Sequence, residues 1–252
     1  MNISVTSEFE KWAKGFSGCD GGNLETGKIW FSGIEWGLGF DSTAFNFDKY
    51  PSEKIEEWLD DYRDTFRKSP FDRGVVQLYS VMTGNKVGDY LKVAKEEKVF
   101  ARDSKLFKMN IYPLAFKRDG DELWNEGWYK ITGLPTKSTY RAWCQQHRFP
   151  EIKKWVEKYN PKVVIASGVS YKADFLMAFA GPEQLYTLSK IVPESIAEGR
   201  EFFWCEINNG KTILVIIPFL TGRWGLNSYD LIEKFGSRIS EICTNKFGEK
   251  WL

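Results

Sequence analysis

The sequence predicts an α/β fold, a three-layer α/β/α arrangement around a central, mainly parallel sheet of four strands. Apolar runs of strand length, at about 28–33, 106–111, 163–168 and 213–217, alternate with segments whose apolar residues recur at helical spacing. The run at 163–168 is apolar on both faces, as in a parallel sheet covered by helices on both sides. No linker, repeat or low-complexity segment interrupts residues 1–252, so we expect a single domain.

Helices are expected at 5–15, 52–68, 74–82, 86–97, 138–147, 150–159, 170–180 and 228–245. In the second of these, Ile55, Trp58, Leu59 and Tyr62 recur at helical spacing after Ser52.

Turn signals separate the later elements. Asn160-Pro161 ends a helix before the strand at 163–168. Asn208-Asn209-Gly210 predicts a hairpin turn between strands at 202–207 and 211–217. Asn227 or Ser228 is expected to cap the last helix.

Composition excludes several classes of protein. The chain is 42% hydrophobic and 27% charged, which is ordinary for a globular protein, but 16% of its residues are aromatic, with eleven Trp. Aromatic side chains fill cores and also stack on bases and sugars. Four scattered cysteines and one histidine make a zinc site improbable, so we expect neither metal nor cofactor. No signal pattern or membrane-length apolar run is present, and we expect a cytoplasmic monomer that does not bind membranes.

Positive charge is concentrated in one stretch. Between Arg102 and Lys172 there are fourteen Lys and Arg against seven Asp and Glu, a balance of +7, while the whole chain carries +1. The remainder therefore carries −6. This asymmetry is consistent with a basic face for a polyanion such as DNA, although lysines on solvated helices produce the same count.

The loop after the first strand is the first candidate site. Gly33-Ile34-Glu35-Trp36-Gly37 follows the apolar run, and its glycines permit a close approach of backbone to ligand. Glu35, beside Trp36, is a candidate catalytic carboxylate. The alternative is that Gly33 and Gly37 only shape a turn and that Glu35 is solvated.

Three strands end in loops with chemical content, and such loops meet at one edge of a parallel sheet. In these loops the sequence resembles the uracil-DNA glycosylase superfamily, most closely its single-strand-selective monofunctional branch. Gly33-Ile34-Glu35-Trp36-Gly37 stands where that branch has Gly-x-Asn-Pro-Gly, and Asn110-Ile111-Tyr112-Pro113-Leu114 fits its Asn-x-x-Pro-Leu motif. Phe219-Leu220-Thr221-Gly222-Arg223 stands in place of His-Pro-Ser-Pro-Arg, without the histidine.

The resemblance implies a DNA glycosylase with two principal catalytic residues. Glu35 would orient water and face the cationic sugar, and Asn110 would bind the pairing edge of an extruded base. We expect the two to face each other across a slot as wide as a nucleobase. Asn110 could instead only hold its own turn. Other residues expected around the base are Gly33, Trp36, Gly37, Phe45, Phe47, Tyr112 and Phe219, although core packing is an alternative for at least one of Phe45 and Phe47.

The last loop is expected to form the wedge that enters DNA when the base leaves. Arg223, Trp224 and Leu226 would insert, supported by Thr221 and Asn227. Without the family's histidine, Asn110, Thr221 or backbone amides would have to stabilise the leaving base. His147 lies far from the strand ends and is expected to be structural or to contact phosphate.

The expected substrate is a bulky modified pyrimidine in DNA, such as the glycosylated hydroxymethylcytosine of some phage genomes. A carboxylate can accept from the cytosine amino group, and aromatic faces suit an appended sugar. Some members of the superfamily serve in defence against phage. Uracil excision in repair and a catalytically silent DNA-binding module remain alternatives; a nucleotide-handling α/β enzyme is disfavoured because no phosphate-binding glycine loop follows a strand. No lysine lies in the three loops, which favours a monofunctional enzyme.

Overall fold

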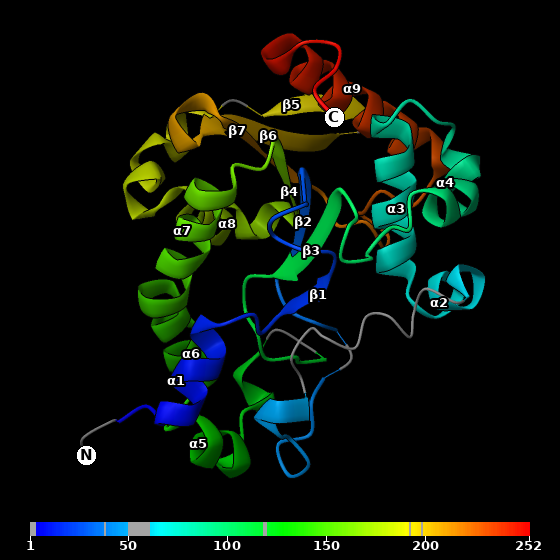
Figure 1. Ribbon diagram of the computed structural model, residues 1–252. Helices are drawn as coiled ribbons and strands as arrows, with labels where there is room; N and C mark the ends of the chain where they lie inside the picture. The colour runs from blue at the N-terminus through cyan, green and yellow to red at the C-terminus, as the bar shows by residue number, and fades with distance from the viewer. Residues whose placement is uncertain (1–3, 38, 50–60, 118–119, 192, 198) are drawn as a thin grey trace.

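A computed structural model of the chain describes residues 4–37, 39–49, 61–117, 120–191, 193–197 and 199–252. A seven-stranded sheet with the order β1-β3-β2-β4-β7-β6-β5 runs through its centre (Figure 1). The strands are β1 (Cys19–Gly21), β2 (Ile29–Gly33), β3 (Leu106–Asn110), β4 (Val163–Ser167), β5 (Glu194–Ala197), β6 (Arg200–Ile207) and β7 (Thr212–Ile217).

The four central strands are those that the apolar runs predict. β3, β2, β4 and β7 pair in parallel, with Ile29 opposite both Leu106 and Val163. The α/β class is confirmed, but the predicted total of four strands is wrong. β6 pairs antiparallel to β7 through the expected hairpin, and the short β1 and β5 add antiparallel edges. β1 and β5 have three and four residues, too few for an apolar period to reveal them.

Helices cover both faces of the sheet because alternate strand residues point to opposite faces. Trp30, Val164 and Leu214 belong to one core and Phe31 and Ile165 to the other. Figure 1 shows the two groups of helices on opposite sides of the sheet. The first core is covered by α1 (Ser7–Lys14), α5 (Glu126–Thr132), α6 (Lys137–Trp143), α7 (Phe149–Tyr159) and α8 (Lys172–Ala180); the second by α2 (Tyr62–Lys68), α3 (Pro70–Met82), α4 (Tyr90–Glu96) and α9 (Tyr229–Phe247).

Most predicted helices are present with shifted ends. α3 begins at Pro70, earlier than predicted, because Ser69 caps it. Ser228 caps α9, as one of the two predicted alternatives. Of the helix predicted at 52–68, only α2 lies within the described residues; positions 52–60 lie outside them. α5 was not predicted, and none of the helices in the described part of the chain combines the length and apolar character needed to cross a bilayer.

A fully buried arginine joins the layers near the end of β3. Arg148 lies in a π-helical turn, Cys144–Arg148, that connects α6 to α7. Its Nε donates to the carbonyl of Ile111 at 2.7 Å, and its Nη2 donates to the carbonyls of Asn110 and Ser17. Burial lowers the pKa of Arg148. These bonds attach the chain before β1 and the α6–α7 junction to the strand end that carries Asn110.

Candidate functional site

The loops of the candidate site leave the sheet at one edge. Gly33, the last residue of β2, pairs with Asn110, the last residue of β3. On the other side of β2, Ser167 at the end of β4 pairs with Ile217 at the end of β7. The three loops singled out in the sequence therefore begin at the carboxyl ends of neighbouring parallel strands, where α/β proteins bind ligands.

Glu35 is held by two cations of α6. Lys137 Nζ lies 2.9 Å from Glu35 Oε1, and Arg141 Nη2 lies 3.8 Å from Oε2. The Glu35 side chain is 10% exposed and that of Lys137 only 1%. The Lys137 ammonium also lies 4.2 Å from the centre of the Phe116 ring. Glu35 is therefore part of a buried ion pair, not a solvated turn residue.

Arg141 extends this cluster across the strand ends. Its guanidinium lies 5.4 Å from the Tyr112 ring, beyond β3, and 6.0 Å from the Tyr171 ring, beyond β4. Phe219, beyond β7, makes an edge contact with Tyr171 at 6.4 Å. Residues from all four parallel strand ends thus form one continuous cluster with Glu35.

The hydroxyl of buried Tyr112 belongs to a second polar group. It donates to Asp174 Oδ1 of α8 at 3.1 Å, and Gln145 Nε2 donates to the same oxygen at 2.8 Å. Burial, with the nearby Asp174 charge, raises the pKa of Tyr112. Tyr112 therefore contacts the site in two ways, with its hydroxyl on Asp174 and its ring beside the Arg141 guanidinium.

Asn110 is packed tightly against β2. Its side chain is buried, and a β-carbon on Gly33 would collide with Asn110 Oδ1. Phe71 of α3 is the next neighbour of that position. Gly33 is therefore needed for the close approach of the Asn110 amide. Asn110 lies on the α3 side of the sheet edge while Glu35 reaches toward α6, so the prediction that the two side chains face each other across a slot is wrong.

Trp36 is positioned by a buried charge cluster. Its Nε1 donates to Asp20 Oδ2 of β1 at 2.7 Å, and Lys108 Nζ of β3 lies 3.1 Å from the same oxygen. Lys108 also pairs with Asp72 of α3. Burial would lower the pKa of Lys108, but the charges of Asp20 and Asp72 outweigh it and raise that pKa. Burial raises the pKa of Asp20 against the opposing charge of Lys108. Next to Trp36, Gly37 is exposed and borders open space.

Phe45 and Phe47 pack into an aromatic cluster. Both rings lie 5.4 Å from the Trp12 ring of α1, and Phe45 lies 5.4 Å from the Trp128 ring of α5. Both are half-buried. These contacts are those of the packing alternative for the two residues, and none of them is with the Glu35 cluster.

The last loop presents aromatic and basic groups to solvent. Phe219 is 43% exposed and Trp224 is 78% exposed. The Arg223 guanidinium lies 5.4 Å from the Trp224 ring, and Thr221 is also exposed. Asn227 Nδ2 donates to the carbonyl of Gly222 at 3.2 Å, which holds the loop closed. These are the properties expected of a wedge.

Leu226 does not belong to the wedge. It is only 1% exposed and packs in the core beneath α9, so the prediction that it inserts into DNA is wrong. The exposed His147 packs against the Trp143 ring at 5.0 Å.

Sequence reasoning missed Lys137, Arg141, Gln145 and Asp174. They lie on α6, α8 and the turn after α6, and the hydrogen bond between Lys137 and Glu35 spans 102 positions. The only sequence signal for these cations was the excess of basic residues between Arg102 and Lys172, and it indicates a region of the chain rather than individual residues. No group of three or more His, Cys, Asp or Glu side chains within the described residues is arranged to hold a metal ion.

Comparison with known proteins adds no relative: the sequence matches no protein-family model and no curated protein.

Proposed function

We propose that the protein is a DNA glycosylase that flips out a modified pyrimidine and hydrolyses its N-glycosidic bond, leaving an abasic site. The observation that carries the proposal is the Glu35 cluster: a carboxylate paired with Lys137 and Arg141 and bordered by rings from neighbouring strand ends. A carboxylate that lies beside two cations at the strand ends is suited to a reaction whose transition state carries positive charge on a sugar.

The reaction assigns a separate task to each charge. The bond from the sugar C1′ to the base nitrogen breaks, and its electron pair leaves with the base. Glu35 stabilises the cationic sugar and orients a water whose oxygen forms the new bond to C1′. The proton released by that water passes to the departing base, directly or through Glu35. Arg141, whose side chain is 23% exposed, is the donor that lowers the cost of negative charge on the base, a task left open by the missing histidine, and the buried Lys137 positions Glu35.

Two further features support the resemblance to the uracil-DNA glycosylase superfamily. β3, β2, β4 and β7 form a parallel centre within the larger sheet, and the first two motifs leave it side by side at Gly33 and Asn110. The buried amide of Asn110 supplies both a donor and an acceptor for a base edge.

A bulky modified cytosine is favoured over uracil as the base. The exposed ring of Phe219 offers a flat apolar face next to the strand ends, and such faces bind sugars. Excision of uracil, which needs no such platform, is the alternative substrate assignment.

The test is an assay of purified protein on three otherwise identical DNA strands, containing cytosine, uracil or glucosylated 5-hydroxymethylcytosine. Abasic sites are detected by alkaline cleavage. We expect product from the glucosylated strand and a rate at least about a hundredfold lower for Glu35→Gln, because the substitution keeps the shape and removes the charge. Glu249→Gln, at an exposed position, is the matched control.

The outcomes separate the assignments. Product from the uracil strand alone would replace the modified base with uracil. Equal rates for Glu35→Gln and the parent would remove Glu35 from the mechanism.

A catalytically silent DNA-binding module is the second candidate. The observation that favours it is that Glu35 is 10% exposed and already engaged by two cations, which restricts its access to water. It predicts DNA binding without an abasic product from any strand, and unchanged DNA affinity in Glu35→Gln.

A further inference from the structure

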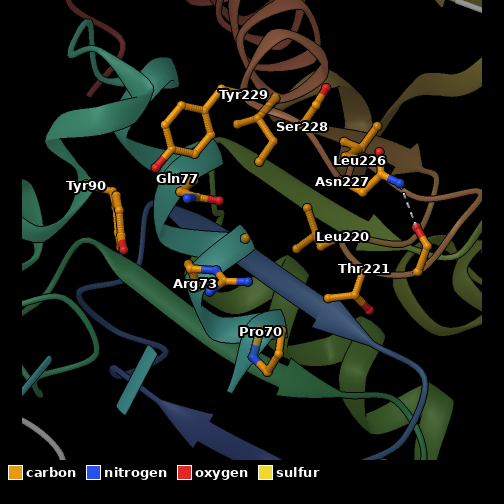
Figure 2. A pocket seen from close by; sticks show the side chains of 13 residues that line it. Pro70, Arg73, Gln77, Tyr90, Leu220, Thr221, Leu226, Asn227, Ser228 and Tyr229 are labelled. Carbon is orange, nitrogen blue, oxygen red and sulfur yellow. Dashed lines mark hydrogen bonds between the residues drawn. The ribbon is translucent and has the colours of Figure 1, made fainter. Parts of the chain in front are cut away.

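A cavity of about 430 Å³ lies between α3 and the turn that leads into α9, and neither Glu35 nor Asn110 lines it (Figure 2). Its volume is within the range of small-molecule sites. Its wall is made by α3, by Tyr90 at the start of α4, and by the chain from Leu220 to Ile232. The lining residues are Pro70, Arg73, Gly74, Gln77, Tyr90, Leu220, Thr221, Gly222, Leu226, Asn227, Ser228, Tyr229 and Ile232.

Arg73 is the charged group of this wall. Its guanidinium forms no ion pair or side-chain hydrogen bond with any residue that the structure describes. None of the described residues that line the cavity is acidic. Asp230, in the first turn of α9, pairs instead with Lys234 at 2.8 Å. The cavity therefore holds a positive charge that no neighbouring carboxylate within the described chain offsets.

Gln77 is a buried amide that faces the same space. It lies one helical turn after Arg73, so the two side chains share a face of α3, and Figure 2 shows both between Tyr90 and Leu220. Gln77 is only 6% exposed, yet its amide forms no hydrogen bond with any described residue. The amide atoms themselves remain accessible to solvent, so they can bond a polar ligand that enters the cavity.

The N-terminus of α9 adds donors of the same kind. α9 has 19 residues, and Ser228 caps it by accepting a hydrogen bond from the backbone N–H of Leu231. The N–H groups of Tyr229 and Asp230, at the first two helical positions, have no acceptor within the helix. A guanidinium, an unpaired amide donor and a helix N-terminus together match the oxygens of a phosphate.

The remaining wall is apolar and aromatic. Leu220, Leu226 and Ile232 line it together with Tyr90 and Tyr229, and Figure 2 shows the two tyrosine rings on one side of the cavity and Leu220 and Leu226 on the other. We propose that this cavity binds a nucleotide, with its phosphate on Arg73, Gln77 and the α9 N-terminus and its base against the apolar wall. The nucleotide is either free or part of a DNA strand, and the site is separate from the Glu35 cluster.

Isothermal titration calorimetry of the full chain tests this with four probes: thymidine 5′-monophosphate, thymidine, inorganic phosphate and a ten-nucleotide thymidine strand. We expect the monophosphate to bind at least about tenfold more tightly than thymidine or phosphate, because only it fills both parts of the cavity. Arg73→Gln is expected to weaken it at least about tenfold. Arg63→Gln, an equal charge change at an exposed position of neighbouring α2, is the control and should change the affinity less than twofold.

A second variant guards against misfolding. Gln77→Leu removes an amide that forms no hydrogen bond with the described residues, so its melting temperature should not fall, while its affinity for the monophosphate should. If the strand displaces the monophosphate, the site binds DNA. If the strand does not displace it, the site binds free nucleotide.

The proposal would be overturned if neither the monophosphate nor the strand bound. It would also be overturned if Arg73→Gln and Gln77→Leu both bound the monophosphate as tightly as the parent. Equal affinity for phosphate and monophosphate would overturn the placement of the base. Glu35→Gln is titrated in parallel, and we expect parental affinity because Glu35 does not line the cavity. If Glu35→Gln loses excision but still binds the monophosphate, the excision depends on the Glu35 cluster and the nucleotide site is unaffected.

Discussion

The carboxylates of Glu35, Asp20 and Asp72 are held in two different ways. Glu35 lies between two cations of one helix, whereas Asp20 and Asp72 share the single ammonium of Lys108. In the second group, two carboxyl groups among the described residues lie on one ammonium, and ionised Asp20 would be a buried charge. Burial penalises such a charge, which is the cause of the raised pKa of Asp20.

The raised pKa of Asp20 predicts the sign of a pH effect. Because the folded protein holds the Asp20 proton more tightly than the unfolded chain, this carboxyl contributes stability below its unfolded pKa and loses that contribution as pH rises through the folded value. Asp20→Asn imitates the protonated form. We therefore expect its free energy of unfolding, relative to the parent, to increase as pH rises from 4 to 7, measured by urea denaturation.

Asp41 is the control with the opposite sign. Hydrogen bonds from the backbone N–H and the hydroxyl of Thr43 lower its pKa. Its contribution is present above the unfolded pKa and lost as pH falls, so Asp41→Asn should lose stability relative to the parent over the same rise. Identical trends in the two variants would contradict the assignment.

At the scale of elements, α6 is the helix that brings cations to Glu35. It is only seven residues long and depends on its cap: Thr136 Oγ1 accepts from the N–H of Thr139, and Thr139 Oγ1 accepts from the N–H of Thr136, both at 3.0 Å. Lys137 is the first residue after this cap, so the capping box fixes the backbone position from which the Lys137 side chain extends to Glu35.

Thr136→Ala should lower the free energy of unfolding by about 1 kcal/mol, because it leaves the first turn of α6 without its side-chain acceptor. Chemical denaturation measures this. Ser237→Ala, at an exposed position within α9, is the control and should change stability by less than about 0.5 kcal/mol. An equal effect of both substitutions would argue against the role of the cap.

At the scale of the whole molecule, the carboxyl edge of the sheet combines a buried charged cluster with an exposed aromatic loop. Trp224 and Phe219 leave large apolar surfaces uncovered within the described structure, and Arg223 lies against the first. These two exposed rings and the Arg223 guanidinium are the features on which the proposed DNA-binding wedge rests.

Trp224→Ala should weaken DNA binding by about 5- to 100-fold, the loss of one aromatic contact with a base, while stability changes by less than about 0.5 kcal/mol. Fluorescence anisotropy with a labelled duplex measures the affinity at fixed salt. Tyr186→Ala is the matched control, since Tyr186 is 86% exposed but lies in another segment of the chain, Pro182–Lys190. Equal affinity of the parent and Trp224→Ala would exclude the wedge.

Much of the fold follows from local pattern. The runs that became β2, β3, β4 and β7 are apolar because helices cover both of their faces, and Ser228 and Asn208-Asn209-Gly210 act through bonds to near neighbours. The short edge strands β1 and β5 cannot be predicted from local sequence pattern, because their extended conformation depends mainly on hydrogen bonds to β3 and β6.

The sequence by itself determined the α/β class, the parallel strands and the edge at which Gly33, Glu35 and Asn110 lie, because apolar period and strand-end loops are local properties. Tertiary structure alone decided that Lys137 and Arg141 pair with Glu35, that Leu226 is buried and that Arg73 and Gln77 face one cavity. Those facts depend on contacts between elements far apart in the chain. The chemical role of a charged side chain depends on the groups that tertiary packing places beside it, and residue spacing along the sequence does not predict those groups.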